Sequence, residues 1–241
     1  MYIRSVKRAE NEIIEGYEYL SEIPSIQNLT ELEFKKPVTF FIGENGSGKS
    51  TLMEAVAVNY GFNPEGGTKN FNFSTRETHS GLYDVITLVK SPFRPNDGFF
   101  LRAESFYNVA TVVEEVASRG SRGYEDWGGK SLHEQSHGES FLALVQNRFK
   151  GHGLYLLDEP EAALSPSRQL SLIALIHQLV QKNSQVIIAT HSPILMAYPM
   201  AEIFHFGEKG IQKVAYEETE HFNITRDFLE NPKRMLDILM E

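Results

Sequence analysis

The sequence feature that most constrains the fold is a glycine-rich run between an apolar segment and a helical pattern. Residues 43–50 read Gly-Glu-Asn-Gly-Ser-Gly-Lys-Ser and fit the pattern G-x-x-x-x-G-K-[ST]. The apolar run Val38–Ile42 precedes them, and the helical pattern Thr51–Asn59 follows. Glycines allow a tight turn that aims backbone N–H groups at phosphate oxygens, and the start of the following helix adds partial positive charge. This strand–loop–helix unit predicts an α/β fold with a phosphate site at the loop.

The residue types within the loop suit this chemistry. Lys49 supplies a mobile positive charge for the outer phosphates of a nucleotide, and the hydroxyl of Ser50 can bind Mg²⁺. A glycine turn that matches the pattern by chance is the alternative, and the flanking strand and helix argue against it. The predicted nucleotide contacts are consecutive in the sequence: Glu44, Asn45, Gly46, Ser47, Gly48, Lys49, Ser50 and Thr51.

Two further apolar runs, Leu154–Leu157 and Val186–Thr190, are short and end in polar residues. Buried strands of a parallel sheet have this pattern. The helical patterns Glu139–Phe149 and Ser167–Lys182 lie before and between these two runs. The alternation of strands and helices predicts an α/β class, with a core of mostly parallel sheet and an inserted helical lobe.

A chain of 241 residues is long enough for one large domain. We predict a single domain, residues 1–241, whose core comprises residues 1–103 and 151–216. The helical lobe is expected at about residues 104–150, and two C-terminal helices within residues 217–241 are expected to pack against the body.

Composition excludes several classes of protein. The chain has no cysteine, so disulfides, thiolate catalysis and cysteine-bound metals are ruled out. No apolar run approaches the roughly 18–20 residues that a membrane-spanning helix needs. The net charge of -9 argues against a protein whose whole surface binds nucleic acid. We expect a cytoplasmic protein.

Acidic and imidazole groups follow the two later apolar runs. Asp158 and Glu159 come directly after Leu154–Leu157, and His191 follows Val186–Thr190. Because parallel strands end at one edge of a sheet, these side chains are expected near the glycine-rich loop. Asp158 suits a magnesium site beside the loop's serine, and Glu159 can orient or deprotonate an attacking water. His191 can hydrogen-bond the terminal phosphate or that water.

The ordered set of phosphate loop, Ser-x-Gly-Glu, Asp-Glu and Thr-His resembles the ATP-binding-cassette (ABC) ATPases. Within them the chain resembles the AAA-type branch of SMC and DNA-repair ATPases, which includes small stand-alone bacterial members. The resemblance implies a P-loop NTPase fold that hydrolyses ATP with Mg²⁺. It also implies a signature segment, here residues 136–140, that caps the γ-phosphate bound to a second copy. The nucleotide contacts implied there are Ser136, Gly138 and Glu139.

The signature segment is also readable by itself. Ser136 and Glu139 have the spacing of a capping box, which predicts a helix start that presents free N–H groups to an anion. By the resemblance, residues 161–166 form the loop that crosses the same dimer interface.

The chain also departs from the family's pattern. His137 stands where transporter ATPases usually have a signature glycine, and Glu104 stands nearest to the place of the expected glutamine. Glu104 would there be a further metal ligand. Tyr17 or Tyr19 could stack on adenine, with Arg8 near the base or ribose. The spacing between the motifs leaves no room for an SMC-type coiled-coil arm.

Three functional interpretations follow. The first is an ATPase acting as a switch or motor in a head-to-tail homodimer, without membrane contact, in DNA maintenance or defence and with a nuclease or toxin partner. DNA contact would fall to Arg119, Arg122 and Lys130 in a glycine-rich loop. The second is the ATP-binding subunit of a membrane transporter. The third is a zinc peptidase, because residues 133–137 match H-E-x-x-H, although Gly138 interrupts the helix that this motif needs.

Overall fold

The computed structural model describes residues 1–8, 17–68, 80–108, 110–111, 131 and 133–240. Its centre is a six-stranded sheet with the strand order β5-β6-β7-β3-β8-β9. Every neighbouring pair from β5 to β8 is parallel, and β9 joins β8 as an antiparallel edge hairpin. The fold is therefore the predicted P-loop NTPase α/β class. The strands are β3 (Val38–Ile42), β5 (Asp97–Arg102), β6 (Gly153–Asp158), β7 (Gln185–Ala189), β8 (Ala201–Gly207) and β9 (Gly210–Val214).

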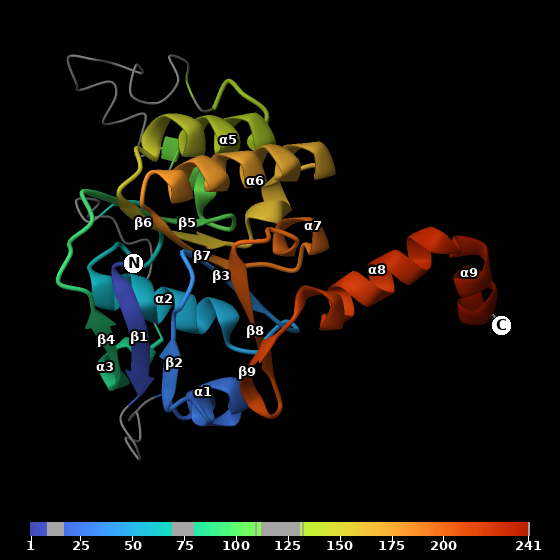
Figure 1. Cartoon of the computed structure of the whole chain (residues 1–241), viewed down its shortest axis with the longest axis horizontal. Helices are drawn as coiled ribbons and strands as arrows, with labels where there is room; N and C mark the ends of the chain where they lie inside the picture. Colours follow the sequence, from blue (N-terminus) through green and yellow to red (C-terminus); the bar gives the residue numbers. More distant parts are fainter. Residues whose placement is uncertain (9–16, 69–79, 109, 112–130, 132, 241) are drawn as a thin grey trace.

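Both faces of this sheet are covered, which explains the continuous apolar runs. In β3, Val38, Phe40 and Ile42 point into one apolar cluster, and Phe41 points into the other. Helices α5, α6 and α7 lie on the first face, and α2 lies on the second (Figure 1). The bounds of these helices are α2 (Lys49–Tyr60), α5 (His137–Arg148), α6 (Pro166–Gln181) and α7 (Pro193–Met196).

A second sheet of three antiparallel strands, in the order β2-β1-β4, covers α2. The buried side chain of Gln185 on β7 joins the two sheets: it accepts hydrogen bonds from the backbone N–H groups of Tyr2 (2.6 Å) and Ile3 (2.9 Å). We did not predict this sheet from the sequence. Its strands and the short helices near it are β1 (Ile3–Arg8), β2 (Glu31–Glu33), β4 (Ile86–Lys90), η1 (Glu18–Glu22), α1 (Pro24–Gln27) and α3 (Leu82–Val85).

The predicted elements occur at the expected places. Strand β3 has the predicted bounds, whereas β6 begins one residue earlier and ends one residue later. Helix α2 begins at Lys49 rather than at Thr51. Much of the predicted lobe, residues 112–130 and 132, lies outside the described residues, so the domain bounds stay a prediction. None of the helices in the described part of the chain is long and apolar enough to span a bilayer.

A partly buried ionic cluster fastens the signature helix to the sheet. The carboxylate of Asp97 pairs with Arg148 at the end of α5 (2.6 Å) and accepts a hydrogen bond from the hydroxyl of Tyr155 (2.8 Å). Burial alone would raise the pKa of Asp97, but Arg148 and Tyr155 together hold it below its usual value. The charged form of Asp97 is therefore part of the fold at neutral pH.

The C-terminal helices differ from the expectation. Helices α8 (Glu220–Glu230) and α9 (Pro232–Met240) project away from the body, and neither contains a buried residue (Figure 1). The prediction that they pack against the body holds only for the first turn of α8, where His221 contacts His191, and was wrong for the rest of α8 and for α9. Both faces of the sheet are already covered by other helices, so no apolar surface is left there for these two.

Candidate functional site

The glycine-rich loop forms a tight cradle at the carboxyl end of β3. Gly43, Gly46 and Gly48 have φ values of 138°, 78° and 97°, which side-chain-bearing residues rarely adopt. A Cβ atom on Gly43 would collide with the carbonyl oxygen of Phe206. The Nζ atom of Lys49 lies across the loop and donates to the carbonyls of Gly43 (2.7 Å) and Glu44 (2.9 Å). Burial lowers the pKa of Lys49, although the nearby carboxylates oppose the shift.

The N-terminal segment forms the floor of this loop. Ser25, which is buried, donates a hydrogen bond to the carbonyl of Ser47. A Cβ atom on Gly48 would lie only 2.8 Å from Ser25 Oγ and 2.9 Å from Ile23 Cγ2. Arg8 donates to the carbonyl of Ile26 (2.6 Å), so it supports this floor.

The predicted magnesium site lies at the carboxyl ends of β5 and β6. The Oγ atom of Ser50 donates to Asp158 Oδ1 at 3.0 Å. Burial raises the pKa of Asp158 to about 6, and Arg102 and Ser50 limit the rise. Arg102, at the end of β5, lies 3.4 Å from Asp158 and 3.0 Å from Glu54. A hydroxyl and a carboxylate oxygen are ligands that suit Mg²⁺.

Glu104 lies at the mouth of the same site. A pocket of about 160 Å³ is lined by Ser50, Arg102, Ala103, Glu104, Asp158 and Glu159. The carboxylate of Glu104 is exposed and pairs with Arg102 at 3.2 Å. The predicted metal ligand thus lines the mouth of the pocket, and the guanidinium of Arg102 pairs with both it and Asp158.

The water-activating side is formed by Glu159 and His191. Glu159 follows β6 in the left-handed conformation (φ 52°), and its Oε1 lies 3.8 Å from His191 Nε2. The backbone N–H of His191 donates to the carboxylate of Glu161 at 2.5 Å. Burial and the charge of Lys49 lower the pKa of His191, although Glu159 opposes the shift. The neutral imidazole is therefore the main form at pH 7.

His221, in the first turn of α8, completes this side. Its Nε2 atom lies 3.2 Å from His191 Nδ1, so one imidazole donates and the other accepts. Because Nδ1 of His191 contacts His221, the other ring nitrogen, Nε2, faces Glu159 and the phosphate loop.

Two buried polar atoms at the loop have no hydrogen-bond partner among the described residues: Ser47 Oγ and His191 Nε2. Buried polar groups are normally paired, and an anion can supply the missing partner. With the cradle of N–H groups and Lys49, these atoms fit a bound phosphate group.

The signature residues form a separate site. Ser136 caps α5, and the carboxylate of Glu139 accepts from its backbone N–H (3.1 Å) and hydroxyl (2.6 Å). Arg168 on α6 donates to both residues, at 3.2 Å and 3.0 Å. A Cβ atom on Gly138 would lie 2.6 Å from Arg168 Nη1 and 2.7 Å from the carbonyl oxygen of Ala163. The helix start therefore packs against residues 160–163, and the exposed Ser136 faces outward.

The structure thus brings the loop, the acidic pair and His191 together. No hydrogen bond or ion pair of the described residues connects Ser136, Gly138 or Glu139 to that group. Asn45 and Thr51 lie on the loop and at the start of α2, without a contact that defines a role. Of the predicted adenine-stacking residues, Tyr17 is partly buried and Tyr19 is exposed, and their rings lie 6.3 Å apart.

The zinc pattern is not assembled. Helix α5 begins at His137, so His133 and His137 do not share one helical face as the motif requires. His133 instead contacts the ring of Tyr107, at 4.7 Å between centroids, and His137 contacts Phe106, at 5.3 Å.

Four residues of the site were not identified in advance: Ser25, Arg102, Glu161 and His221. Glu161 lies within the predicted interface loop, but its hydrogen bond to His191 joins segments that are 30 residues apart. Arg102 follows an apolar run and precedes Glu104, a position that could have been noticed. Nothing in the local sequence distinguishes Ser25 or His221.

Comparisons with known proteins agree with this geometry. A family model described as an AAA domain matches residues 19–150, and one described as an AAA ATPase domain matches residues 140–196. The cobalt import ATP-binding protein CbiO of Salmonella typhimurium is 26% identical over 215 residues, 80% of this chain and 79% of that protein.

Solved structures show the same fold. The cbiO1 structure from Clostridium perfringens, part of an ABC transporter complex, has a TM-score of 0.56 and 17% identity over 100% of this chain and 99% of that one. The SMC head domain from Thermotoga maritima has a TM-score of 0.47 and 17% identity, over 89% and 98%. The comparisons do not resolve a branch within the ABC ATPases. The chain belongs to the AAA domain family and is an ATP-hydrolysing enzyme with the ABC ATPase fold.

Proposed function

We propose that two copies of this chain close head to tail around two ATP molecules and that hydrolysis drives a partner protein. The observation that supports this most is that the predicted site residues form two separate groups within one chain. The phosphate loop, Asp158, Glu159 and His191 lie together, whereas Ser136 is exposed at the start of α5 and pairs with Arg168. A helix N-terminus with an exposed cap can bind an anion that another molecule presents.

Each group in the loop region would have one role. Lys49 would leave the carbonyls of its own loop to bind the outer phosphates. Ser50, Asp158 and Glu104 would hold Mg²⁺, which neutralises phosphate charge when bound. Glu159 would orient the attacking water and accept its proton, and neutral His191 would donate from Nε2 to a phosphate oxygen.

The proposal has two versions, which differ in the partner protein. The named relative is the ATP-binding subunit of an importer, which favours a membrane-embedded partner over a stand-alone switch. This reverses our expectation of a chain without membrane contact. No relative reported above supports a nuclease or toxin partner, and the predicted DNA contacts Arg119, Arg122 and Lys130 lie outside the described residues.

The stand-alone switch remains the second candidate. It is favoured by His137 in place of the signature glycine and by Glu104 where transporters are expected to have glutamine. Tagged protein isolated from detergent-solubilised membranes separates the two candidates: co-purification of a membrane-spanning protein supports the transporter subunit. Recovery only from the cytosolic fraction, without such a protein, supports the switch.

Head-to-tail closure can be tested by cross-linking, because the chain has no native cysteine. One sample carries Asn45→Cys and the other His137→Cys, both with Glu159→Gln to block hydrolysis. A short bismaleimide should join the two samples only with Mg-ATP. Lys49→Ala in both should abolish the product, and Ser171→Cys in place of His137→Cys is the matched control. No cross-link at saturating ATP would refute the closure.

A further inference from the structure

The C-terminal arm, defined here as residues 219–240, exposes an unusual amount of apolar surface. Helices α8 and α9 have 11 and 9 residues. Isolated helices shorter than about 12–15 residues are marginal in water. These two helices therefore need a covering surface. Their exposed apolar side chains range from 38% to 75% exposed: Ile224, Phe228, Leu229, Leu236, Ile238, Leu239 and Met240.

The start of the arm is fixed to the body. Thr219, 3% exposed, accepts from the N–H of Phe222 (3.3 Å) and donates to the carbonyl of Tyr216 (2.7 Å). The hydroxyl of Tyr216 donates to the carbonyl of Pro193 (2.9 Å), beside His191. Because this anchor sets the direction of α8, the far end of the arm stands clear of its own body (Figure 1). The described residues of the body leave these apolar side chains exposed.

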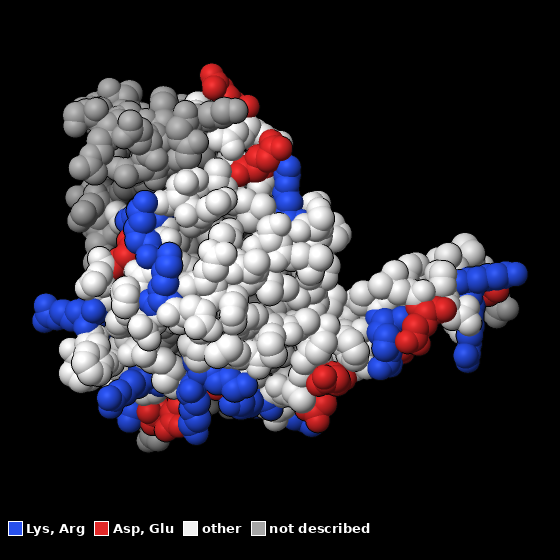
Figure 2. Space-filling model, turned by 45° about the horizontal axis from the view of Figure 1, so that its top comes forward, with Lys and Arg blue, Asp and Glu red and all other residues white. Residues whose placement is uncertain are grey.

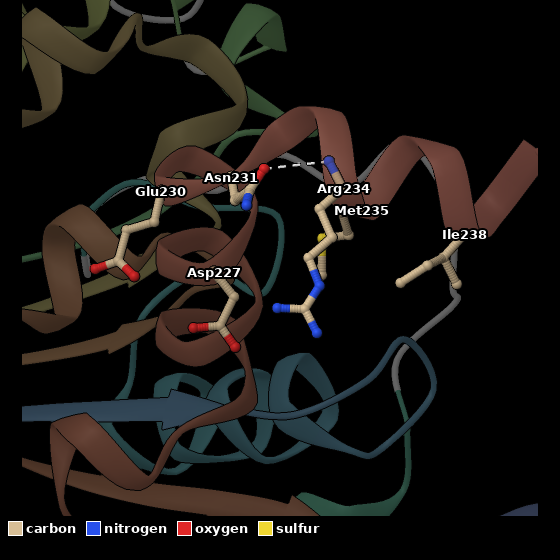
Figure 3. Close-up of a pocket in the computed structure, with 6 residues that line it drawn as sticks. All are labelled: Asp227, Glu230, Asn231, Arg234, Met235 and Ile238. Atoms are coloured by element: carbon tan, nitrogen blue, oxygen red, sulfur yellow. Dashed lines mark hydrogen bonds between the residues drawn. The ribbon is translucent and has the colours of Figure 1, made fainter.

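A groove of about 590 Å³ lies between the two helices of the arm (Figure 3). Asp227 and Glu230 come from α8, whereas Arg234 extends from α9 into the same space, with Met235 and Ile238 beside it. Asp227 already pairs with Arg226, at 2.7 Å. No salt bridge among the described residues involves Glu230 or Arg234.

Charge decides which occupant fits. The end of α8 is acidic, through Asp227 and Glu230, and the start of α9 is basic, through Lys233 and Arg234. Both signs lie side by side on the arm (Figure 2). A surface with adjacent acidic and basic halves is complementary to its own copy when the two are related by a two-fold axis. The apolar residues of the second arm would also cover those of the first.

We propose that the C-terminal arms of two copies pair with each other and join two ATPase bodies without nucleotide. The α9 helix of one copy occupies the groove of the other, so that the basic half of each arm meets the acidic half of its partner. The pairing does not depend on the proposed closure around ATP. It would favour that closure, because tethered sites meet at an effective concentration in the millimolar range.

The apolar part of the pairing is tested by sedimentation of the whole chain, without nucleotide and with chelator. We expect a dimer at low micromolar concentration. Ile238→Asp with Leu239→Asp should raise the dissociation constant at least about 100-fold, since two apolar contacts are replaced by buried charges. Phe93→Asp, at a residue 75% exposed on the body, is the matched control and should leave the dimer intact.

The charge pairing is tested by mixing. One variant carries Asp227→Lys and Glu230→Lys, and the other carries Lys233→Glu and Arg234→Glu. Each variant alone should dimerise about 10-fold more weakly, because like charges face each other, and an equimolar mixture should recover the wild-type affinity. Charge pairing within one arm cannot produce recovery on mixing. An unchanged far-UV circular dichroism spectrum of each variant shows that the body is folded.

Several results would overturn the proposal. A full-length chain that is monomeric at about 100 µM without nucleotide would do so, as would a dimer that persists in the Ile238 and Leu239 variant. Failure of the mixture to recover affinity would refute the charge pairing. Binding of monomer to vesicles of phosphatidylcholine and phosphatidylglycerol (3:1) would identify the arm as a membrane contact instead. By contrast, a dimer of the Lys49→Ala variant would support the proposal, because it would show that the arms pair without a working nucleotide site.

Discussion

Two glycines of the phosphate loop provide a matched test of the N-terminal floor. Gly46 and Gly48 both have positive φ, 78° and 97°, so alanine strains the backbone at either position. They differ in the space around an added Cβ. Nothing lies within 4 Å of it at Gly46, whereas Ser25, Ile23 and Ile26 lie at 2.8, 2.9 and 3.0 Å at Gly48.

The expected magnitudes follow from these two terms. A left-handed backbone costs a residue with a Cβ about 1–2 kcal/mol. Forcing an extra methyl group into packed atoms costs a further ~1–3 kcal/mol. Gly46→Ala should therefore lower the free energy of unfolding by about 1–2 kcal/mol, and Gly48→Ala by about 2–5 kcal/mol. The second loss is a large part of the stability of a typical domain, about 5–15 kcal/mol.

Urea unfolding without nucleotide, followed by both tryptophan fluorescence and far-UV circular dichroism, measures the difference. The midpoint should fall more for Gly48→Ala than for Gly46→Ala, with unchanged slope. Equal losses within about 0.5 kcal/mol would refute the reasoning, because the contact with residues 23–26 would then contribute nothing.

Four further variants test other parts of the site and fold. Lys49→Ala should weaken ATP binding about 100-fold, measured by titration of a fluorescent analogue, through loss of ~3 kcal/mol of charge-assisted bonding. Gly138→Ala should lower kcat about 10-fold with unchanged ATP affinity, since the added Cβ displaces the signature helix. His221→Ala should lower kcat about 10-fold with little change in KM, because the imidazole it orients becomes free. Asp97→Asn should cost about 3 kcal/mol of unfolding free energy at pH 7.

The loss of unfolding free energy in Asp97→Asn should depend on pH in a known direction. The folded-state pKa of Asp97 is lowered from 3.8, so its ionised form stabilises the fold above that pH. The difference between wild type and Asp97→Asn should shrink as pH falls through the lowered folded-state value. A difference independent of pH would contradict the ionic role. Unchanged ATP affinity in Lys49→Ala, or unchanged kcat in the Gly138 and His221 variants, would contradict the assignments of those residues.

The parts of the fold that were predicted correctly have strong local patterns. Val38–Ile42 is buried at every position because both faces of its sheet are covered, and the glycines after it are required by positive φ. The three-stranded sheet was missed because β1 and β2 are only six and three residues long and β1 does not alternate strictly, since its adjacent residues Ser5 and Val6 are both buried. Such short, irregular patterns are a weak signal.

The predictions of the site residues succeeded and failed for the same reason. Asp158 and Glu159 were predicted because they follow a clear strand, whereas Arg102 and His221 enter the site through tertiary contacts alone. The two C-terminal helices within residues 217–241 were also expected correctly. The sequence did not indicate where their apolar faces are covered, since this depends on surface elsewhere in the molecule.

Arg102 gives the ATPase a resident counterion. Its guanidinium touches the carboxylates of Glu54, Glu104 and Asp158, two of which have side chains at most 12% exposed. Like charges at such distances would repel one another without a cation between them. Arg102 therefore offsets part of the repulsion within this acidic corner by itself, so a cation that bound there would share these carboxylates with the guanidinium.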